Sequence, residues 1–246
     1  SRTVAEIKKM IAAESDSVKR ENLREMYEAN AWLVENPPRN FREVCQWMAW
    51  NNMAERTYCR AGAGCQLDET LRPYYEKDLA EGKIDREKAV YIIACLLLND
   101  PHYYQIAGPD ENGNDMTSDI SFMILEAAHL LKTTCNLTIR YHKNLNEDLF
   151  RLGLDILLTD KKACPRFSGD EALVKGFMKN GYSYELASVF LRNFNSFVSV
   201  IISLVGRISS DDGEHSADKL RPDGVQHAHR VLSLGSLSFV IVPVLA

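Results

Sequence analysis

Residues 136–142 read Asn-Leu-Thr-Ile-Arg-Tyr-His, and the alternation in this stretch decides the fold class. Apolar and polar side chains take turns along it, with Leu137, Ile139 and Tyr141 set against Thr138, Arg140 and His142. A period of two residues predicts a β-strand with one apolar face and one polar face. Because Arg140 and His142 share the polar face, that face suits either a polar pocket or a salt-bridged surface patch.

Helical patterns surround this strand on both sides. Apolar residues recur at three- and four-residue steps and predict helices over residues 41–55, 85–98, 118–131 and 147–158. A turn at residues 167–170 precedes a further helix that runs to Met178. Long helices separated by short strands predict a helix-rich α/β fold.

The helix expected at residues 85–98 has Asp85 as a capping residue and an almost wholly apolar stretch from Val90 to Leu98. A helix that is apolar all round is buried on most of its sides. We therefore expect Cys95, which lies within this stretch, to be a small core residue.

The composition excludes several classes of protein and partner. Of the 246 residues, 46% are hydrophobic and 26% charged, which excludes a disordered tail. The formal net charge of −5 gives no attraction for nucleic acids or anionic membranes. Two apolar runs, residues 194–205 and 231–244, are too short and too rich in serine for a membrane span. We expect neither nucleic acid nor a membrane as a partner.

A change in composition near residue 187 predicts a domain boundary. Residues 1–187 contain all ten Tyr and all three Trp, whereas residues 188–246 contain neither and are rich in serine. This pattern fits either a natural second domain or a C-terminal segment that does not belong to the same protein as residues 1–187.

The cysteines and histidines do not predict a metal site. The six Cys include no Cys-x-x-Cys pair, and dispersed thiols in a chain of this length are typical of the reducing cytoplasm, where we place the protein. The His pair in residues 226–229 has no third ligand nearby. The polar loop at residues 107–118 has Ser121 where a calcium loop needs an acidic residue, so we interpret it as a turn that leads into a helix capped by Thr117 or Ser118.

Four stretches, taken in order, resemble segments of the glycyl radical enzymes, the pyruvate formate-lyase family. Residues 66–79 share the family's Asp and Pro-Tyr-Tyr elements, and residues 108–115 share its Gly-x-Asp element. Residues 136–142 share its Asn-Leu-x-x-Arg element, and residues 165–170 share its Pro-x-Phe-x-x-Asp element. Each is weak alone, but their common order and spacing give the resemblance its strength. It covers about residues 1–187, which we take as a domain fragment of this family, with residues 188–246 as an atypical tail.

The resemblance implies a fold and a chemistry. The family fold is a ten-stranded α/β barrel wrapped by helices and built from two half-barrels, and this chain would supply a half-barrel. A separate activating enzyme, which uses S-adenosylmethionine and an iron–sulfur cluster, installs a glycyl radical in the full-length protein. A barrel cysteine then becomes a thiyl radical that attacks a small organic substrate. The full-length parent would be a homodimeric lyase, dehydratase, decarboxylase or formate acyltransferase of anaerobic metabolism.

The chain departs from the family after residue 187. The family presents a Val-Gly-Cys motif there, whereas this chain reads Ser-Val-Phe-Leu-Arg over residues 188–192, and the radical Arg-Val-x-Gly-Tyr loop is absent. We therefore expect a truncated, fused or frameshifted product that binds no cofactor, contains no catalytic residue and is inactive by itself. The alternatives are a non-catalytic helical scaffold derived from the same fold and, as a minor option, a membrane-attached protein.

The first half of a substrate pocket would remain. By resemblance, Tyr58, Arg60 and Ala61 belong to a segment that lines the barrel, with Arg60 as an anchor for an anion or hydroxyl group. Cys65 and Gln66 stand where relatives carry Gly and Arg, which leaves the substrate open.

Overall fold

A computed structural model describes residues 1–59, 66–99, 103–131, 135–160, 162, 164–189 and 191. They belong to the first of two compact units, Ser1–Val198. The atypical tail from residue 192 onwards and its His pair at residues 226–229 lie outside the described residues, and so do Arg60, Ala61 and the side chain of Tyr58.

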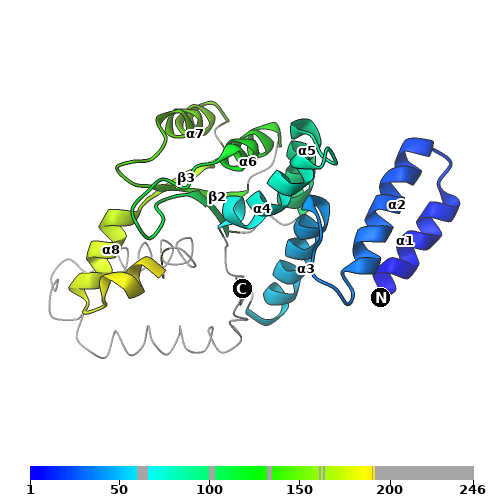
Figure 1. Ribbon diagram of the computed structural model, residues 1–246, viewed down its shortest axis with the longest axis horizontal. Helices are drawn as coiled ribbons and strands as arrows, with labels where there is room; N and C mark the ends of the chain where they lie inside the picture. Colours follow the sequence, from blue (N-terminus) through cyan, green and yellow to red (C-terminus); the bar gives the residue numbers. More distant parts are fainter. Residues whose placement is uncertain are drawn as a thin grey trace. The chain divides into compact units, whose positions relative to one another are not determined.

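In the described residues five helices come before the first strand, and from there helices alternate with short strands (Figure 1), which confirms a helix-rich α/β fold. In chain order the elements are α1 (Arg2–Ala13), α2 (Ser17–Trp32), α3 (Phe41–Cys59), α4 (Leu67–Ala80), α5 (Arg86–Asn99), β1 (Tyr103–Ala107), α6 (Asp119–Leu130), β2 (Asn136–Tyr141), α7 (Glu147–Asp160), β3 (Arg166–Gly169) and α8 (Asp170–Lys179).

The three strands form one parallel sheet in the order β1-β2-β3. Helix α6 connects β1 to β2 and α7 connects β2 to β3, because parallel neighbours need a long crossover connection. The predicted strand at residues 136–142 is β2, the central strand of this sheet.

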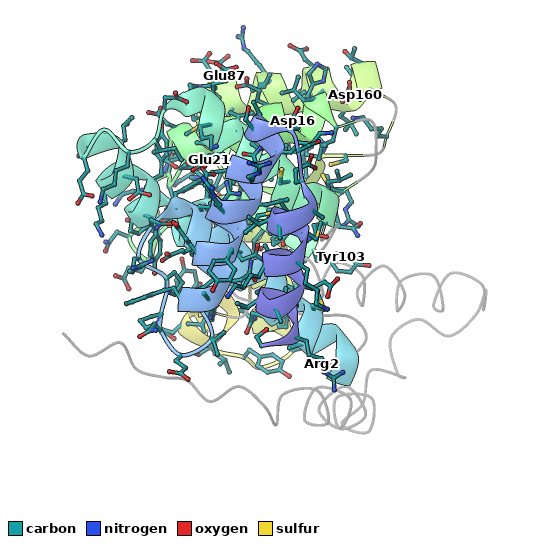
Figure 2. All side chains as sticks on the ribbon, turned by 90° about the vertical axis from the view of Figure 1, so that its right-hand side faces the viewer. Arg2, Asp16, Glu21, Glu87, Tyr103 and Asp160 are labelled. Atoms are coloured by element: carbon teal, nitrogen blue, oxygen red, sulfur yellow. The ribbon has the colours of Figure 1, made fainter. Side chains whose placement is uncertain are left out.

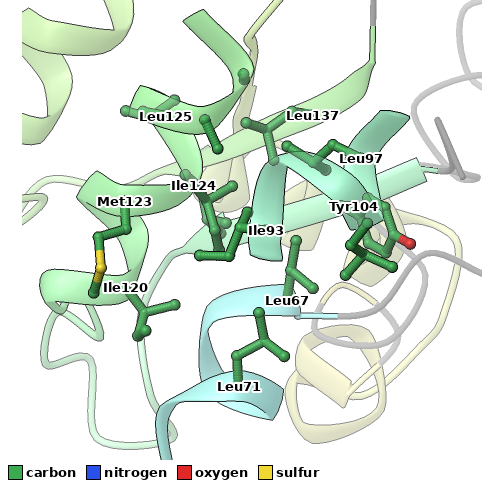
Figure 3. Packing of buried hydrophobic residues seen from close by; sticks show 14 of the residues in the cluster. Leu67, Leu71, Ile93, Leu97, Tyr104, Ile120, Met123, Ile124, Leu125 and Leu137 are labelled. Atoms are coloured by element: carbon green, nitrogen blue, oxygen red, sulfur yellow. The ribbon is translucent and has the colours of Figure 1, made fainter. Parts of the chain in front are cut away.

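The apolar side chains of the sheet face α5, α6 and α7 and form the core. Tyr104, Ile106, Leu137 and Ile139 are fully buried there. Figure 3 shows Tyr104 and Leu137 beside the apolar residues of α4, α5 and α6, among them Leu67, Ile93, Leu97, Ile120, Ile124 and Leu125. The opposite face of the sheet carries the polar side chains and points toward α8.

The N-terminal helices form a hairpin that joins α3. Figure 2 shows α1 and α2 side by side with Asp16 at their turn, where its Oδ1 accepts a hydrogen bond of 2.9 Å from the Lys19 amide at the start of α2. Trp50 of α3 donates from Nε1 to Oδ1 of Asn30 in α2 at 2.7 Å. The start of α3 is fixed by Asp78 of α4, whose Oδ2 accepts from the Phe41 amide at 2.7 Å.

The structure corrects the prediction for Cys95, which is exposed. Tyr91, Cys95 and Leu98 lie on one stripe of α5 that points away from the core, whereas Ile92, Ile93, Leu96 and Leu97 are buried. An apolar run therefore does not make α5 buried all round. Among the described residues, no helix combines the length and the apolarity needed to cross a membrane.

Two local predictions also differ from the structure. The predicted turn at residues 167–170 is instead the end of strand β3 followed directly by the first residue of α8, because Phe167 pairs with Ile139 of β2. Strand β1 was not predicted, since it is short and comes directly before a Gly-Pro turn signal. Ser118 is the N-cap of α6, which confirms one of the two candidate caps.

We predict that Gly153→Ala in α7 lowers stability while Gly176→Ala in α8 raises it. A methyl group at residue 153 would overlap Cδ1 of Ile139 and lie 3.1 Å from Cζ of Phe167, whereas one at residue 176 meets nothing within 4 Å. Both changes gain helix propensity of about 1 kcal/mol, but overpacking costs about 1–3 kcal/mol. Urea unfolding of both variants measures the difference, and equal stabilisation would contradict the packing of α7 on the sheet.

Candidate functional site

The polar face of the sheet is unusual because its side chains are buried. Gln105 of β1, Thr138 and Arg140 of β2, and Ser168 of β3 are all at least nine-tenths buried. The parallel register places Gln105 beside Thr138, and Arg140 beside Ser168, so these polar side chains form two adjacent rows. A buried polar face must satisfy its hydrogen bonds internally, and this requirement organises the surrounding loops.

Arg140 lies at the centre of this face and is only 2% exposed. Its Nη2 pairs with Oδ2 of Asp170 at 2.5 Å, and its Nη1 donates to Oε1 of Gln66 at 3.0 Å. A guanidinium group taken out of water needs an ionic partner and satisfied donors. Asp170, the first residue of α8, and Gln66, just before α4, supply both.

Gln66 and Asp68 attach the start of α4 to the end of β1. The Gln66 side chain donates from Nε2 to the carbonyl oxygen of Ala107 at 2.5 Å and to Oδ1 of Asp68 at 3.1 Å. Oδ2 of Asp68 accepts from the Ala107 amide at 2.7 Å and from the Ser121 hydroxyl at 2.6 Å. Asp68 therefore connects α4, β1 and α6 through one carboxyl group.

The corner that follows β1 has an unusual backbone. Ala107 has φ of +57°, a left-handed conformation that costs a residue with a side chain about 1–3 kcal/mol. Gly108 follows with φ of +94°, and a Cβ atom there would lie 2.8 Å from Cζ of Arg140. The hydrogen bonds from Gln66 and to Asp68 hold Ala107 in place, and the missing side chain at Gly108 lets Arg140 lie against the backbone.

Burial raises the pKa of Asp68 above its ordinary value. The hydrogen bonds that its carboxylate accepts from the Ala107 amide, Ser121, Gln66 and the Glu69 amide act in the opposite direction and offset part of this effect. Asp68 therefore takes up a proton at a higher pH than an exposed aspartate does.

A second polar contact closes the same end of the sheet. Nε2 of His142, just after β2, lies 3.0 Å from Oδ1 of Asp115 in the loop that follows β1. Oδ2 of Asp115 accepts from the Asn146 amide at 3.0 Å, which fixes the start of α7. His142 is buried as well. The polar face of β2 is therefore buried, and the Arg140–Asp170 pair makes it a salt-bridged face.

The four stretches that carried the family resemblance therefore meet in space. Gln66 and Asp68 come from the first, Asp115 from the second, Arg140 from the third and Asp170 from the fourth. Gln66, Asp68, Arg140 and Asp170 are joined by hydrogen bonds, and Asp115 contacts the third stretch through His142. We call these six residues the polar network. Sequence reasoning singled out Arg140 and His142 but assigned no role to Gln66, Asp68 or Asp170, which lie at the starts of α4 and α8.

The predicted substrate residues Tyr58, Arg60 and Ala61 are not placed by the structure, because their side chains lie outside the described residues. They precede Gln66 by a few positions, and the backbone of Gln66 forms a parallel bridge to Gln105 of β1.

The polar network lies where ligands bind in parallel α/β sheets, outside the carboxyl ends of the strands. Within the part of the chain that the structure describes, no group of three or more His, Cys, Asp or Glu residues is placed to hold a metal ion. A cavity of about 240 Å³ lies elsewhere, between α2, α3 and α5, and ion pairs such as Arg42 with Glu25 and Arg39 with Glu43 occupy its charged side chains. The polar face is the stronger candidate site.

Residues 1–190 match the sequence profile of the family described as pyruvate formate lyase-like. The chain is 27% identical over 205 residues to an isethionate sulfite-lyase of Oleidesulfovibrio alaskensis, with 72% of this chain and 24% of that protein covered. It thus spans about a quarter of the length of the curated relatives it matches.

Solved structures give the same fold at lower identity. A structure concerned with 1,2-propanediol dehydration in Roseburia inulinivorans superposes with a TM-score of 0.68 at 22% identity, covering 76% of this chain and 26% of that one. The glycerol-bound B12-independent glycerol dehydratase of Clostridium butyricum superposes with a TM-score of 0.67 at 20% identity, covering the same shares.

We predict that Asp170→Asn is strongly destabilising, because it leaves the buried charge of Arg140 without a counter-ion. Removing one member of a buried pair costs about 3–5 kcal/mol. The matched control is Glu147→Gln, which removes the partner of Arg151 in an exposed pair of similar N–O distance, 2.5 Å. Guanidinium unfolding should show a large shift for the first variant and none for the second; similar shifts would mean that Arg140 does not depend on Asp170.

The raised pKa of Asp68 predicts a pH dependence of stability. As pH rises above the ordinary aspartate pKa of about 3.9, the unfolded chain loses its proton before the folded chain does. The free energy of unfolding of the wild type should then fall, relative to that of Asp68→Asn, until the pH reaches the folded pKa. Unfolding curves of both proteins between about pH 4 and about pH 8 test this. A wild type that instead gains stability over the variant would show that the hydrogen bonds outweigh burial.

Proposed function

The chain belongs to the pyruvate formate lyase-like family, and on that premise we propose that it forms one part of a glycyl radical enzyme that cleaves or dehydrates a small organic substrate. The match over residues 1–190 carries this proposal. The similarity to an isethionate sulfite-lyase supports lyase chemistry, and the fold shared with a glycerol dehydratase is consistent with it. These matches favour the enzyme hypothesis over a non-catalytic scaffold.

We propose that β1, β2 and β3 are a section of the wall of the family's ten-stranded barrel, with the polar face turned toward the barrel interior. Support comes from the burial of Gln105, Thr138, Arg140 and Ser168 on one face and of a purely apolar core on the other. An interior of this kind excludes water and holds fixed dipoles around a reacting substrate.

Within this wall the polar network would act through position rather than through direct reaction. The donors of Arg140 are already engaged by Asp170 and Gln66, so the guanidinium group fixes the ends of β1, β2 and β3 relative to one another. Tyr58, Arg60 and Ala61 remain our candidates for direct substrate contact, with Arg60 as the anchor for an anionic or hydroxyl group.

The family's radical chemistry would come from groups that the printed sequence does not contain. Neither a Val-Gly-Cys motif nor an Arg-Val-x-Gly-Tyr loop occurs in it, so we propose that this polypeptide has no radical turnover by itself. The proposed domain spans residues 1–187, with residues 188–246 as a tail of different character. For the complete protein only, we propose a homodimer and a separate activating enzyme that uses S-adenosylmethionine. The free thiols of Cys45 and Cys95 favour a cytoplasmic location.

We predict that the 246-residue chain, incubated anaerobically with an activating enzyme and S-adenosylmethionine, gives no glycyl doublet in electron paramagnetic resonance. The isethionate sulfite-lyase of Oleidesulfovibrio alaskensis with its own activating enzyme is the positive control. A doublet on the chain itself would contradict the proposal that it lacks the radical site.

The gene beyond residue 246 provides the second arm of this test. A downstream Val-Gly-Cys codon run, in the same frame or another, is expected for part of an enzyme, and a polypeptide extended through it and through an Arg-Val-x-Gly-Tyr loop further on should acquire the doublet. A gene that encodes no such run in any frame would support the scaffold hypothesis instead.

A further inference from the structure

Two cysteines that the proposed function does not use lie in contact at the opposite end of the sheet. The Sγ atoms of Cys135 and Cys164 are 3.3 Å apart. Cys135 comes directly before β2 and Cys164 two residues before β3, so the pair joins the amino ends of two neighbouring parallel strands. Both residues are only 6% exposed, and the polar network lies at the carboxyl ends of the same strands.

The surroundings of the two sulfurs make them unequal. The hydrogen-bonded contact with Cys135 lowers the pKa of Cys164, and burial acts in the opposite direction. The backbone amides of Leu137 and Cys135 and the charge of Lys162 lower this pKa further, to a smaller extent. The same hydrogen bond and burial raise the pKa of Cys135. Lys162 is itself held in place by hydrogen bonds to the carbonyl oxygens of Ala128 and Leu131.

The other described thiols differ from this pair. Cys45 is buried in the helical core, where desolvation raises its pKa well above the ordinary value. Cys95 is exposed on α5. Of the four described cysteines, only Cys135 and Cys164 have another sulfur at contact distance.

We propose that Cys135 and Cys164 are an oxidisable dithiol that closes into an intramolecular disulfide when the protein meets hydrogen peroxide. Bond formation needs the sulfurs to approach by about 1.3 Å, to a disulfide length of about 2.05 Å. Side-chain rotation at the two strand ends supplies such a movement without a change in the register of β2 and β3. This assignment is independent of the proposed function.

The chemistry balances with peroxide as the only oxidant. The Cys164 thiolate attacks one oxygen of hydrogen peroxide and the O–O bond breaks, which leaves a sulfenic acid on Cys164 and releases hydroxide. This hydroxide becomes water by taking up the proton that Cys164 lost on ionising. The Cys135 thiol then attacks the sulfenic sulfur, the S–O bond breaks, and the released hydroxide takes up the Cys135 proton as water. Two thiols are oxidised, one peroxide is reduced, and two molecules of water result in all.

The disulfide would tie together two residues that are 29 positions apart, with β2 and α7 between them. A cross-link across such a loop restricts the unfolded chain more than the folded one. We therefore expect the oxidised protein to unfold at a higher guanidinium concentration than the reduced protein.

The test uses the full chain, reduced, freed of reductant and treated with a stoichiometric amount of hydrogen peroxide. After alkylation, tryptic digestion without reductant should yield peptide 133–140 joined to peptide 163–166, two hydrogen masses lighter than the sum of the two. The joined species should disappear on reduction. Retention of both thiols as alkylated cysteines, or joining of either one to a different cysteine, would overturn the proposal.

Cysteine variants distinguish a specific Cys135–Cys164 disulfide from general oxidation of thiols. Cys45→Ser and Cys95→Ser should leave the joined peptides unchanged, whereas Cys164→Ser should abolish them. Cys135→Ser should stop the reaction at a sulfenic acid on Cys164 that dimedone traps. If either pair variant does not fold, peptide mapping of the wild type still decides, because it requires no substitution.

Discussion

The buried ion pair between Arg140 and Asp170 is the constraint around which the described part of the chain is arranged. A guanidinium group at the centre of a parallel sheet is tolerated only with a carboxylate beside it and acceptors for its remaining donors. Asp170 therefore has to begin α8 directly after β3, because it must reach Arg140. For the same reason Gln66 has to lie at the edge of β1, where its side chain accepts from Arg140. Gly108 is required as well, because a side chain there would occupy the space of the arginine.

Much of the fold could be predicted from residue patterns alone. The alternation around Ile139 predicts β2, and Asp85 correctly predicts the start of α5, where its Oδ1 accepts a hydrogen bond of 2.7 Å from the Lys88 amide. What failed was decided by tertiary partners. Cys95 is exposed because it lies on the stripe of α5 that points away from the core, and residues 167–169 form a strand because Ile139 offers them a pairing edge.

The candidate site shows the same division. Arg140 and His142 stand out because a polar face on a strand is visible in the period of the sequence. The contributions of Gln66, Asp68 and Asp170 are not visible in this way, since their partners in other elements are 30 to 74 residues away in the chain. Family resemblance brought those segments to attention without a physical reason, and the hydrogen bonds of the polar network supply that reason.

The left-handed corner at Ala107 has a consequence for the order of folding. Its backbone is favourable only once Asp68 has docked, and Asp68 in turn needs Ser121 from a helix that follows in the chain. Such distant contacts form late because loop closure precedes them. We expect the corner to be absent from the folding transition state, so that it acts as a latch that slows unfolding and leaves the rate of folding almost untouched.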